Sequence, residues 1–547
     1  MKRIYLNLFL LFIIPTFLKA QSTGLRVYEI MQEKCATCHN HADPQGGLDL
    51  EGAGANTSTK FADVYGNIVG QIPANEIAAE NGDHYIYKGR ADRSFLFRKI
   101  NANLDETITL KEGEGQSMPA YGGGVLTEVE TELIRQWILF GAPTSGTVVD
   151  ESLLETYYSG MGQTSFPDGP PEAPAAEEGF QIKMGPFFLE PGGEVEFFTK
   201  YELDLPEDVE VTRLDVKFSN YSHHFIMYDF PNGNPSYIPE GLRLEADHSD
   251  ISLVAAVQEP LDLNLPEGTA FFWDNDRVLD LNSHYINYSA TLPYQAEVYV
   301  NVYTQEQGIA AQEMKTELLV NPSIYIPNNG NEITHTQQVT YNLGEVFLWG
   351  MMGHTHQYGT DYKVYKRLAG GVKGDLIYDA SCALGIPGCV SPYFDYHHIP
   401  MRYFSPLEPI TMNFFNGIIH EAKWVNNGPS PVNFGPTSDD EMMVLVLMYL
   451  EDTTGVVTNL ETIPNPLSEV EVFPNPMDEK TVISIPTGLD GIRFRLFDTQ
   501  GRELRTLTAS KGSTQLEFNR QQLPSGMYFY RIEDESGRFQ SGKLMIN

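Results

Sequence analysis

The chain has 547 residues, a formal net charge of -37 and a hydrophobic content of 41%. Its length exceeds one ordinary hydrophobic core and predicts about three to five domains, and its hydrophobic content excludes a chain that is disordered throughout. The excess of acidic residues excludes nucleic acid and anionic membrane surfaces as partners, because like charges repel one another.

The N-terminal stretch MKRIYLNLFLLFIIPTFLKA, residues 1–20, predicts a secretory signal peptide. Lys2 and Arg3 precede an apolar run, and the small residue Ala20 closes it, which is the layout of such signals. A transmembrane anchor is the alternative, but Pro15 and the polar residues after Ala20 favour cleavage. No later stretch is apolar for long enough to span a bilayer, so we expect no integral membrane span. The mature chain should therefore work in an oxidising compartment.

Residues 22–146 carry helical patterns and are predicted to form a small all-α domain. In LTEVETELIRQWILFGAP, near the end of this region, apolar residues recur at helical spacing: Val129, Leu133, Trp137 and Phe140. Gly141 follows them and should end the helix.

The strongest local motif of this region is Cys35-Ala-Thr-Cys38-His39. The pattern C-x-x-C-H attaches haem c: both thiols add to porphyrin vinyl groups, and the imidazole that follows binds the iron. A redox-active cysteine pair and a chance match are the alternatives. The adjacent histidine, the exported context and the helical pattern favour covalent haem on Cys35 and Cys38, with His39 as an iron ligand.

A second iron ligand is expected in the loop that begins at Gly115 and precedes the closing helix. Met118 is our choice, because a thioether there would raise the reduction potential and favour electron transfer. His41 and His84 are weaker alternatives. The C-x-x-C-H motif near the start, Met-Pro followed by glycines, and a last helix ending W-I-x-x-G-A together make residues 26–143 resemble a class I cytochrome c domain.

Residues 147–179 include FPDGPPEAPAAEEGF and predict a semi-extended linker, because proline, alanine and glutamate dominate. From about residue 180 to 455 the pattern changes to β structure. Short alternating runs such as VEVTRLDVKF, AEVYVNVYT and MMVLVLMYL are separated by Pro, Gly, Asn and Asp clusters. A region of this length predicts two β-sandwiches in series.

Three histidine features occur in this β region, at His223-His224, at His284 and at His354-Thr-His356. Residues i and i+2 of a strand point to the same face, so His354 and His356 can bind one ion. His223 and His224 would point to opposite faces of a regular strand, so joint ligation requires a bulge or a strand end.

Imidazoles combined with a thioether select copper over zinc or magnesium. The late strand SDDEMMVLVLMYL offers three methionines: Met442, Met443 and Met448. The ordered set is HH (His223, His224), HY (His284, Tyr285), HTHxxG (His354, His356, Gly359) and DEM (Asp440 to Met442). As a set it resembles the copper type II, ascorbate-dependent monooxygenases, a family that includes peptidylglycine alpha-hydroxylating and dopamine beta-monooxygenases. The resemblance covers about residues 195–455.

The resemblance implies two tandem jelly-roll-like sandwiches, over residues 180–325 and 326–455. It also implies two copper ions with separate ligand sets. His223, His224 and His284 would form a remote, electron-storing copper site. His354, His356 and Met442 would form the copper site where oxygen binds, with Met443 as the alternative thioether.

The activity implied by the resemblance is hydroxylation of a substrate C–H bond with O2, an oxidoreductase reaction with paired donors. The substrate would be a small molecule or a peptide. We expect the haem c domain to supply the electrons, with an ascorbate-like external reductant as a further source. The alternative is a non-catalytic copper and haem electron-transfer protein of the cell surface.

Two further pairs lie close together in the sequence. Cys382 and Cys389 enclose two glycines and a proline, which predicts a tight loop closed by a disulfide; two free thiols are the alternative. His397 and His398 match no expected ligand, and we interpret them as loop residues.

The C-terminal region, residues 470–547, alternates again in KTVISIP, IRFRLFD and MYFYRIED. Its FPNP, LFDTQGRE and LPSGMYFYRI motifs and its closing GKLMIN resemble the type IX secretion C-terminal sorting domain of Bacteroidetes. The resemblance implies a small Ig-like sandwich of seven strands that is recognised by the type IX machinery. The expected location is therefore outside the cell or on its outer surface, reached through the periplasm.

Overall fold

The computed structural model describes most of the chain, and it leaves the side chains of His223 and Phe539 undescribed. The described residues are 21–102, 104–120, 124–219, 221–246, 251–381, 394–396, 399–435, 439–457, 470, 472–485, 491–498, 502–510, 512–533 and 539–547. The predicted signal peptide, the Cys382–Cys389 disulfide and the pair His397-His398 lie outside them. In the part of the chain that is described, no helix is long and apolar enough to cross a membrane.

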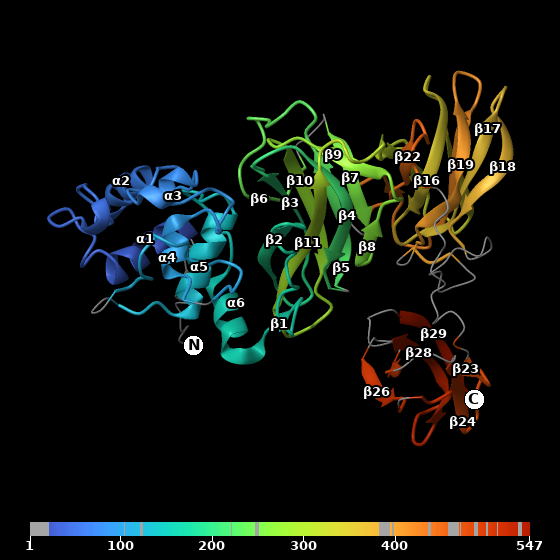
Figure 1. Ribbon diagram of the computed structural model, residues 1–547. Helices are drawn as coiled ribbons and strands as arrows, with labels where there is room; N and C mark the ends of the chain where they lie inside the picture. The colour runs from blue at the N-terminus through green and yellow to red at the C-terminus, as the bar shows by residue number, and fades with distance from the viewer. Residues whose placement is uncertain are drawn as a thin grey trace, which may run out of the picture.

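The fold is mainly β, with a small helical domain at its N-terminal end (Figure 1). The helices of this domain are α1 (Thr23–Lys34), η1 (Gln45–Gly47), α2 (Thr57–Ile68), α3 (Glu76–Glu80), α4 (Phe95–Ile100) and α5 (Glu128–Leu139). The predicted closing helix is confirmed as α5. It begins with a reciprocal capping box between Thr127 and Glu130, and Gly141, at a φ of 80°, follows its end.

The predicted linker is folded at its start. Residues 151–164 form α6 (Glu151–Thr156), a π turn (Tyr157–Met161) and the short strand β1 (Gln163–Thr164). The side chain of Asp150 caps α6 by accepting from the N–H of Ser152, and Leu154 is fully buried. A buried leucine and a helix cap stabilise this segment, so only the later proline-rich part remains without regular structure.

The first sandwich has one seven-stranded and one five-stranded sheet. Its strands after β1 are β2 (Gly179–Leu189), β3 (Glu194–Glu202), β4 (Val209–Lys217), β5 (Ser222–Asp229), β6 (Leu242–Arg243), β7 (Ser252–Val257), β8 (Leu261–Asn264), β9 (Thr269–Trp273), β10 (Val278–Ile286), β11 (Tyr294–Glu306) and β12 (Gln312–Glu313). The larger sheet runs β1-β11-β4-β9-β12, with β2 beside β11 and β8 beside β4; the smaller runs β6-β3-β10-β5-β7.

The second sandwich has two four-stranded sheets, β13-β22-β16-β19 and β15-β20-β17-β18, and a two-stranded sheet, β14-β21. The strands are β13 (Lys315–Val320), β14 (Tyr325–Ile326), β15 (Glu332–Val339), β16 (Gly344–His354), β17 (Gly359–Leu368), β18 (Val372–Asp379), β19 (Arg402–Met412), β20 (Gly417–Val425), β21 (Val432–Asn433) and β22 (Val444–Leu450). Because β13 pairs antiparallel with β22, it belongs to this sandwich and precedes the boundary predicted after residue 325.

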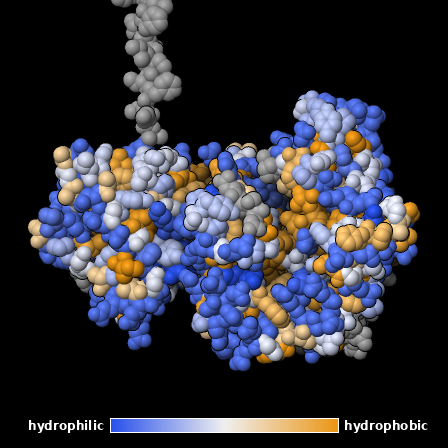
Figure 2. Space-filling model, turned by 90° about the horizontal axis from the view of Figure 1, so that it is seen from above, coloured by the Kyte–Doolittle hydropathy of each residue, from blue (hydrophilic) through white to orange (hydrophobic). Residues whose placement is uncertain are grey.

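The two sandwiches share a continuous core where β7 lies against β13. Four residues of the second sandwich belong to the hydrophobic cluster of the first: Trp349, Leu407, Met448 and Leu450. The hydroxyl of Thr316 on β13 also donates to the carbonyl of Leu253 on β7. In Figure 2 most of the visible surface is hydrophilic, while hydrophobic side chains gather in the hollow between the middle and right-hand lobes, which are the two sandwiches.

The described part of the C-terminal domain contains seven strands, the number predicted, in a three-stranded and a four-stranded sheet. These strands are β23 (Val472–Phe473), β24 (Lys480–Ser484), β25 (Arg493–Phe497), β26 (Glu503–Thr508), β27 (Gln515–Asn519), β28 (Gly526–Glu533) and β29 (Phe539–Ile546). They enclose a hydrophobic cluster of their own, which includes Phe494, Phe518 and Leu544.

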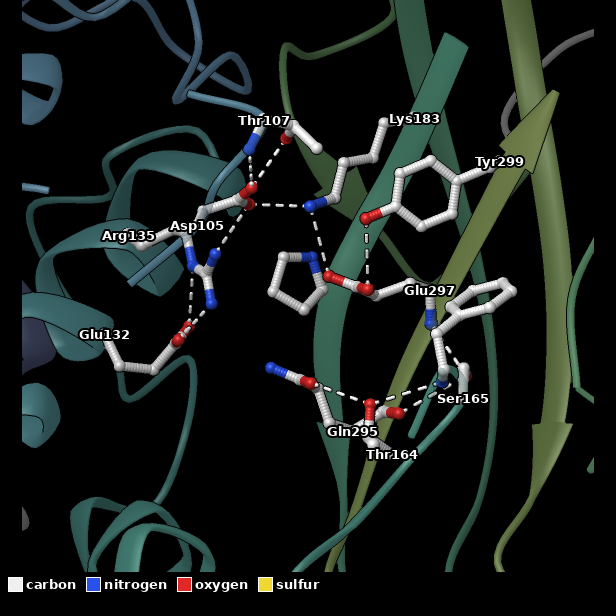
Figure 3. Close-up of polar contacts among 12 residues, drawn as sticks. Asp105, Thr107, Glu132, Arg135, Thr164, Ser165, Lys183, Gln295, Glu297 and Tyr299 are labelled. Atoms are coloured by element: carbon white, nitrogen blue, oxygen red, sulfur yellow. Dashed lines mark hydrogen bonds and ion pairs between the residues drawn. The ribbon is translucent and has the colours of Figure 1, made fainter. Parts of the chain in front are cut away.

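A buried network of ion pairs fixes the helical domain to the first sandwich (Figure 3). Asp105 of the helical domain accepts from Arg135 on α5 at 2.9 Å and from Lys183 on β2 at 2.6 Å. Lys183 also pairs with Glu297 on β11 at 3.1 Å, and Arg135 pairs with Glu132. Burial alone would favour the neutral carboxyl, but the two cations hold the pKa of Asp105 well below its usual value. The helical domain is therefore docked rather than merely tethered.

Candidate metal centres

The predicted haem residues line one cavity of about 460 Å³ in the helical domain. Cys35, Cys38 and His39 line it together with Met118, which the chain brings there from 79 residues beyond His39. Its other walls are mostly apolar and include Met31, Leu50, Phe95, Ile100 and Ile134. A cavity of this size and lining suits a flat apolar cofactor with a few polar contacts.

The imidazole of His39 is oriented for a ligand at its Nε2. Its Nδ1 lies 2.8 Å from the carbonyl oxygen of Gln45, and a carbonyl can only accept, so Nδ1 carries the hydrogen. A backbone carbonyl that holds Nδ1–H is the usual support of a metal-binding histidine, because it fixes the ring and raises its basicity. The donor set and the cavity therefore fit covalent haem c.

The other candidate iron ligands lie elsewhere. His41 is exposed and pairs with Asp49, and His84 stacks on Tyr87 with its ring centroid 4.7 Å away. Neither lines the cavity. Among the three candidates, Met118 alone stands at the cavity wall.

A bulge, one of the two arrangements that joint ligation by His223 and His224 requires, lies at the histidine pair. His284 on β10 is opposite His224 on β5, whereas the next residue, Tyr285, is opposite Ser222. His223 is thus the extra residue of the bulge. His224 and His284 are direct partners across β5 and β10, and their rings lie 5.3 Å apart, centroid to centroid.

Carboxylates on the neighbouring strand β3 hold these two rings. His224 Nε2 lies 3.1 Å from Glu196 Oε1 and 3.0 Å from Asn282 Oδ1, and His284 Nε2 lies 2.8 Å from Glu194 Oε1. The Asn282 amide nitrogen faces oxygens of Glu196 and Phe197, so its own oxygen faces the histidine. Both Nε2 atoms meet acceptors and therefore carry hydrogen, which places the lone pair of a neutral ring on Nδ1. Burial opposes ionisation of Glu196, but the hydrogen bond from His224 keeps its pKa below the usual value.

The second pair lies where β16 ends. His354 is the last residue of the strand, and its ring centroid is 5.2 Å from that of His356. His356 Nδ1 lies 3.1 Å from the backbone oxygen of Asp440, so Nδ1 carries the hydrogen and the lone pair is on Nε2. Burial lowers the pKa of His356 to about 4, so the ring is neutral at pH 7, as metal binding requires.

Glu441 organises the backbone around this pair. Its carboxylate accepts from the backbone N–H groups of His356 at 2.9 Å, Tyr358 at 2.7 Å and Met442 at 3.2 Å, and from the indole of Trp424 at 2.8 Å. Burial raises the pKa of Glu441 to about 7, against the effect of these donors. One buried side chain thus ties the histidine segment to the methionine segment.

The sheet register favours Met442 over Met443 as the thioether. His354 pairs with Val444 across β16 and β22, so extension of the antiparallel ladder places Met442 opposite His356. Met443 is fully buried, and its sulfur accepts from Asn321 within the core of the second sandwich. Met448 is also buried, in the core shared with the first sandwich.

The two histidine pairs form a single row across the boundary between the sandwiches. The ring of His224 lies 6.2 Å from that of His354, centroid to centroid. The first pair was predicted to be remote from the second. That prediction is wrong for these rings, because β5 and β16 meet where the two sandwiches share a core.

The separations within each pair suit two imidazoles on one ion. A metal–nitrogen bond of about 2.1 Å puts the ion roughly 3.2 Å from a ring centroid, so two rings at a tetrahedral angle lie about 5.2 Å apart. The described side chains contain no group of three or more His, Cys, Asp and Glu arranged to hold a metal. Each predicted ligand set includes one residue that such a group cannot count. In the first set the side chain of His223 is not described, and in the second set Met442 would bind through a thioether.

Sequence reasoning missed the residues that support the ligands. Glu194 and Glu196 are two apart on one strand, a pattern that is common on exposed faces and says nothing of distant histidines. Gln258, which follows β7 in the other sandwich, donates its amide N–H to His354 Nδ1 at 2.9 Å, whereas the other three rings donate to their partners. Glu441 lies inside the DEM motif, from which the sequence predicts only Met442 as a ligand.

Residues 471–547 match the family model of the secretion system C-terminal sorting domain. The chain carries a secretion signal at its C-terminal end. The prediction for this region is thereby confirmed, and the protein is secreted or displayed on the outer cell surface. The match covers this domain and leaves the preceding domains without a family assignment.

No curated protein matches the chain in sequence. Among solved structures, CopC from Methylosinus trichosporium OB3b is 16% identical over 14% of this chain and 87% of its own, with a TM-score of 0.12. The STIV MCP is 10% identical over 49% of this chain and 95% of its own, with a TM-score of 0.22. The adhesin domain of Epf from Streptococcus pyogenes is 9% identical over 45% of this chain and 82% of its own, with a TM-score of 0.13. Scores this low carry no conclusion about fold or function.

Proposed function

We propose that the chain is a secreted copper-dependent monooxygenase that hydroxylates a substrate C–H bond with O2 and takes electrons from its own haem c domain. The observation that carries this proposal is the row of four imidazoles, His284, His224, His354 and His356, at the boundary of the sandwiches. The spacing within each pair suits one ion. The proposal includes jelly-roll-like folds for both sandwiches.

The chemistry of the donors selects the metal. Neutral imidazoles suit copper, and the thioether of Met442 near His356 favours copper further. When bound, copper at His354, His356 and Met442 would activate O2, and copper at the first-sandwich histidines would store one electron. Conversion of R–H and O2 to R–OH and water takes up two electrons and two protons, so an electron source is required.

Several residues of the chain position the proposed ligands in the absence of metal. Glu441 fixes the backbone of His356 and Met442 at once, so the two ligands keep their relative position. His354 and His356 are buried, at 8% and 1% exposure, which limits access of water to the reacting atoms. The ion pair between Asp105 and Lys183 joins the helical domain to the first sandwich.

Haem c on Cys35 and Cys38, with His39 and Met118 as iron ligands, completes the proposal. The cavity that these four residues line supports it. The helical domain and the first sandwich form one buried interface, so electron transfer within the chain needs no encounter step. An external reductant would reload the haem.

The test uses the full chain matured in a periplasm and loaded with copper. We expect one covalent haem and two copper ions per chain, and O2 uptake that depends on an added C–H substrate from a panel of small aromatic, amine and peptide compounds. His356→Ala should lose one copper and the substrate-dependent uptake. His41→Ala, at an exposed position of the helical domain that does not line the haem cavity, is the matched control and should keep both.

Two results would decide against the enzyme. Bound copper and haem, with no substrate-dependent O2 uptake and no hydroxylated product, would establish the electron-transfer alternative. A folded wild-type chain that binds no copper would overturn the metal assignment itself. Stopped-flow mixing would add the electron route: reduced haem should be oxidised by the copper sites within one catalytic turnover.

A further inference from the structure

The two histidine pairs differ in the charge that surrounds them. Nε2 of each first-sandwich ring faces a carboxylate, Glu196 for His224 and Glu194 for His284. His356 in the second sandwich meets a neutral backbone carbonyl, and His354 meets the neutral amide of Gln258. The asymmetry is part of the fold, because Glu194 and Glu196 follow each other on one face of β3 and their strand pairs directly with β10.

Two consequences follow for a metal bound by the first pair. An acceptor on Nε2–H leaves Nδ1 as the nitrogen with the lone pair, so the metal is bound through Nδ1. A carboxylate also draws the Nε2 proton toward itself and makes Nδ1 a stronger electron donor, and its negative charge favours the more positive state of the metal. Both effects stabilise Cu(II) over Cu(I).

The strength of each effect depends on burial. The side chain of Glu196 is 16% exposed, and that of Glu194 is 36% exposed. Coulomb interactions are weaker where solvent screens them, so Glu196 should act more strongly than Glu194. Asn282 supports Glu196 by donating to its carboxylate at 3.0 Å while accepting from His224, which fixes the geometry of all three groups.

We propose that Glu194 and Glu196 are positioning residues of the first-sandwich copper site, which select Nδ1 of His284 and His224 as ligands and hold the bound copper toward its oxidised state. At the second-sandwich site the described partners of the two rings are a neutral amide and a neutral carbonyl, and Met442 would add a thioether, which favours Cu(I). This inference rests on the proposed function, since it takes copper as the metal.

The first test needs no metal. Nitrogen NMR of the metal-free chain with labelled histidine reports which ring nitrogen carries hydrogen. We expect Nε2–H for His224 and His284 and Nδ1–H for His356. A metal-free wild-type chain with Nδ1–H on His224 would overturn the proposal whatever the metal does.

The second test measures copper directly in Glu196→Gln and Glu194→Gln. We expect Cu(II) affinity of the first site to fall about tenfold or more in Glu196→Gln, with Cu(I) affinity little changed, and a smaller fall in Glu194→Gln. A tenfold fall in the ratio of Cu(II) affinity to Cu(I) affinity raises the reduction potential of the site by about 59 mV. Glu210→Gln, which alters a buried carboxylate of β4 away from the histidines, is the control for folding.

The outcomes separate this inference from the proposed function. If wild-type and Glu196→Gln chains both bind two copper ions with the same affinities and potentials, the carboxylates are not positioning residues and the monooxygenase proposal stands. If the wild type binds no copper, the proposed function is refuted, and the inference, which takes copper as the metal, is refuted with it. If Glu196→Gln does not fold, Glu194→Gln at the more exposed position still gives the decisive measurement, and an unchanged potential there, together with the Nδ1–H form of His284, would overturn the inference.

Discussion

The ion-pair network between the helical domain and the first sandwich allows a quantitative test of domain docking. Lys183 joins Asp105 at 2.6 Å to Glu297 at 3.1 Å, and its side chain is 18% exposed. Burial disfavours the ammonium, but Glu297 and Asp105 hold the pKa of Lys183 well above its usual value. Lys183→Met keeps most of the volume and removes the cation.

The expected loss of stability in Lys183→Met follows from the charged partners that remain in the network. Removal of one member of a buried pair costs about 3–5 kcal/mol, because the partner stays buried without compensation. Asp105 retains Arg135, and Lys183 is partly solvated, so the lower end, about 3 kcal/mol, applies. Each 1.4 kcal/mol is a factor of about ten, so the undocked population should rise roughly a hundredfold.

Hydrogen exchange measured peptide by peptide would show this loss. Protection should fall at the end of α5 and along β2, which face each other, and stay unchanged in the C-terminal domain. Lys315→Met is the matched control, because its pair with Glu313 is exposed at 37% and 41% and should contribute less than about 1 kcal/mol. Equal protection in the two variants would refute the view that this network holds the domains together.

Three further outcomes are expected. His420 is buried and its pKa is lowered to about 4, so its contribution to stability is present above pH 6.5 and is lost as the pH falls toward 4. Urea unfolding at pH 7 and 4.5 should show about 2.4 kcal/mol less acid loss in His420→Gln than in the wild type. Met118→Ala should keep covalent haem and lower the reduction potential of the haem in a redox titration. Cys38→Ser should reduce the amount of haem that stays on the protein after acid extraction. Normal attachment in Cys38→Ser would contradict the assignment of Cys38 as a haem-attachment residue. Glu441→Gln should lower the free energy of unfolding in urea by about 2 kcal/mol, since a neutral amide cannot accept from all four donors. It should also weaken copper binding at the second-sandwich site. An unaltered copper affinity would exclude the role of Glu441 in organising that site.

Local chemistry explains why much of this protein could be predicted from the sequence. C-x-x-C-H is a contiguous motif, and the helix over 128–139 follows from its apolar spacing and capping residues. The strand period predicts that His354 and His356 converge, but β16 ends at His354, so their rings come within 5.2 Å of each other beyond the end of the strand. Joint ligation by the adjacent His223 and His224 requires a bulge or a strand end, and a bulge is present there. The sorting domain follows in the same way from motifs within one short region.

Only the tertiary structure decided which distant groups meet these motifs. Glu196 is 28 residues from His224, and Glu194 is 90 from His284; β-sheet register, which depends on packing over many residues, brings them together. The approach of His224 to His354 depends on where two sandwiches share a core, and the docking of the helical domain depends on Lys183 reaching Asp105 across a boundary. The sequence determined the candidate ligands within each motif, because short spacing fixes geometry. The fold determined their partners and their charge environment, because those contacts are non-local.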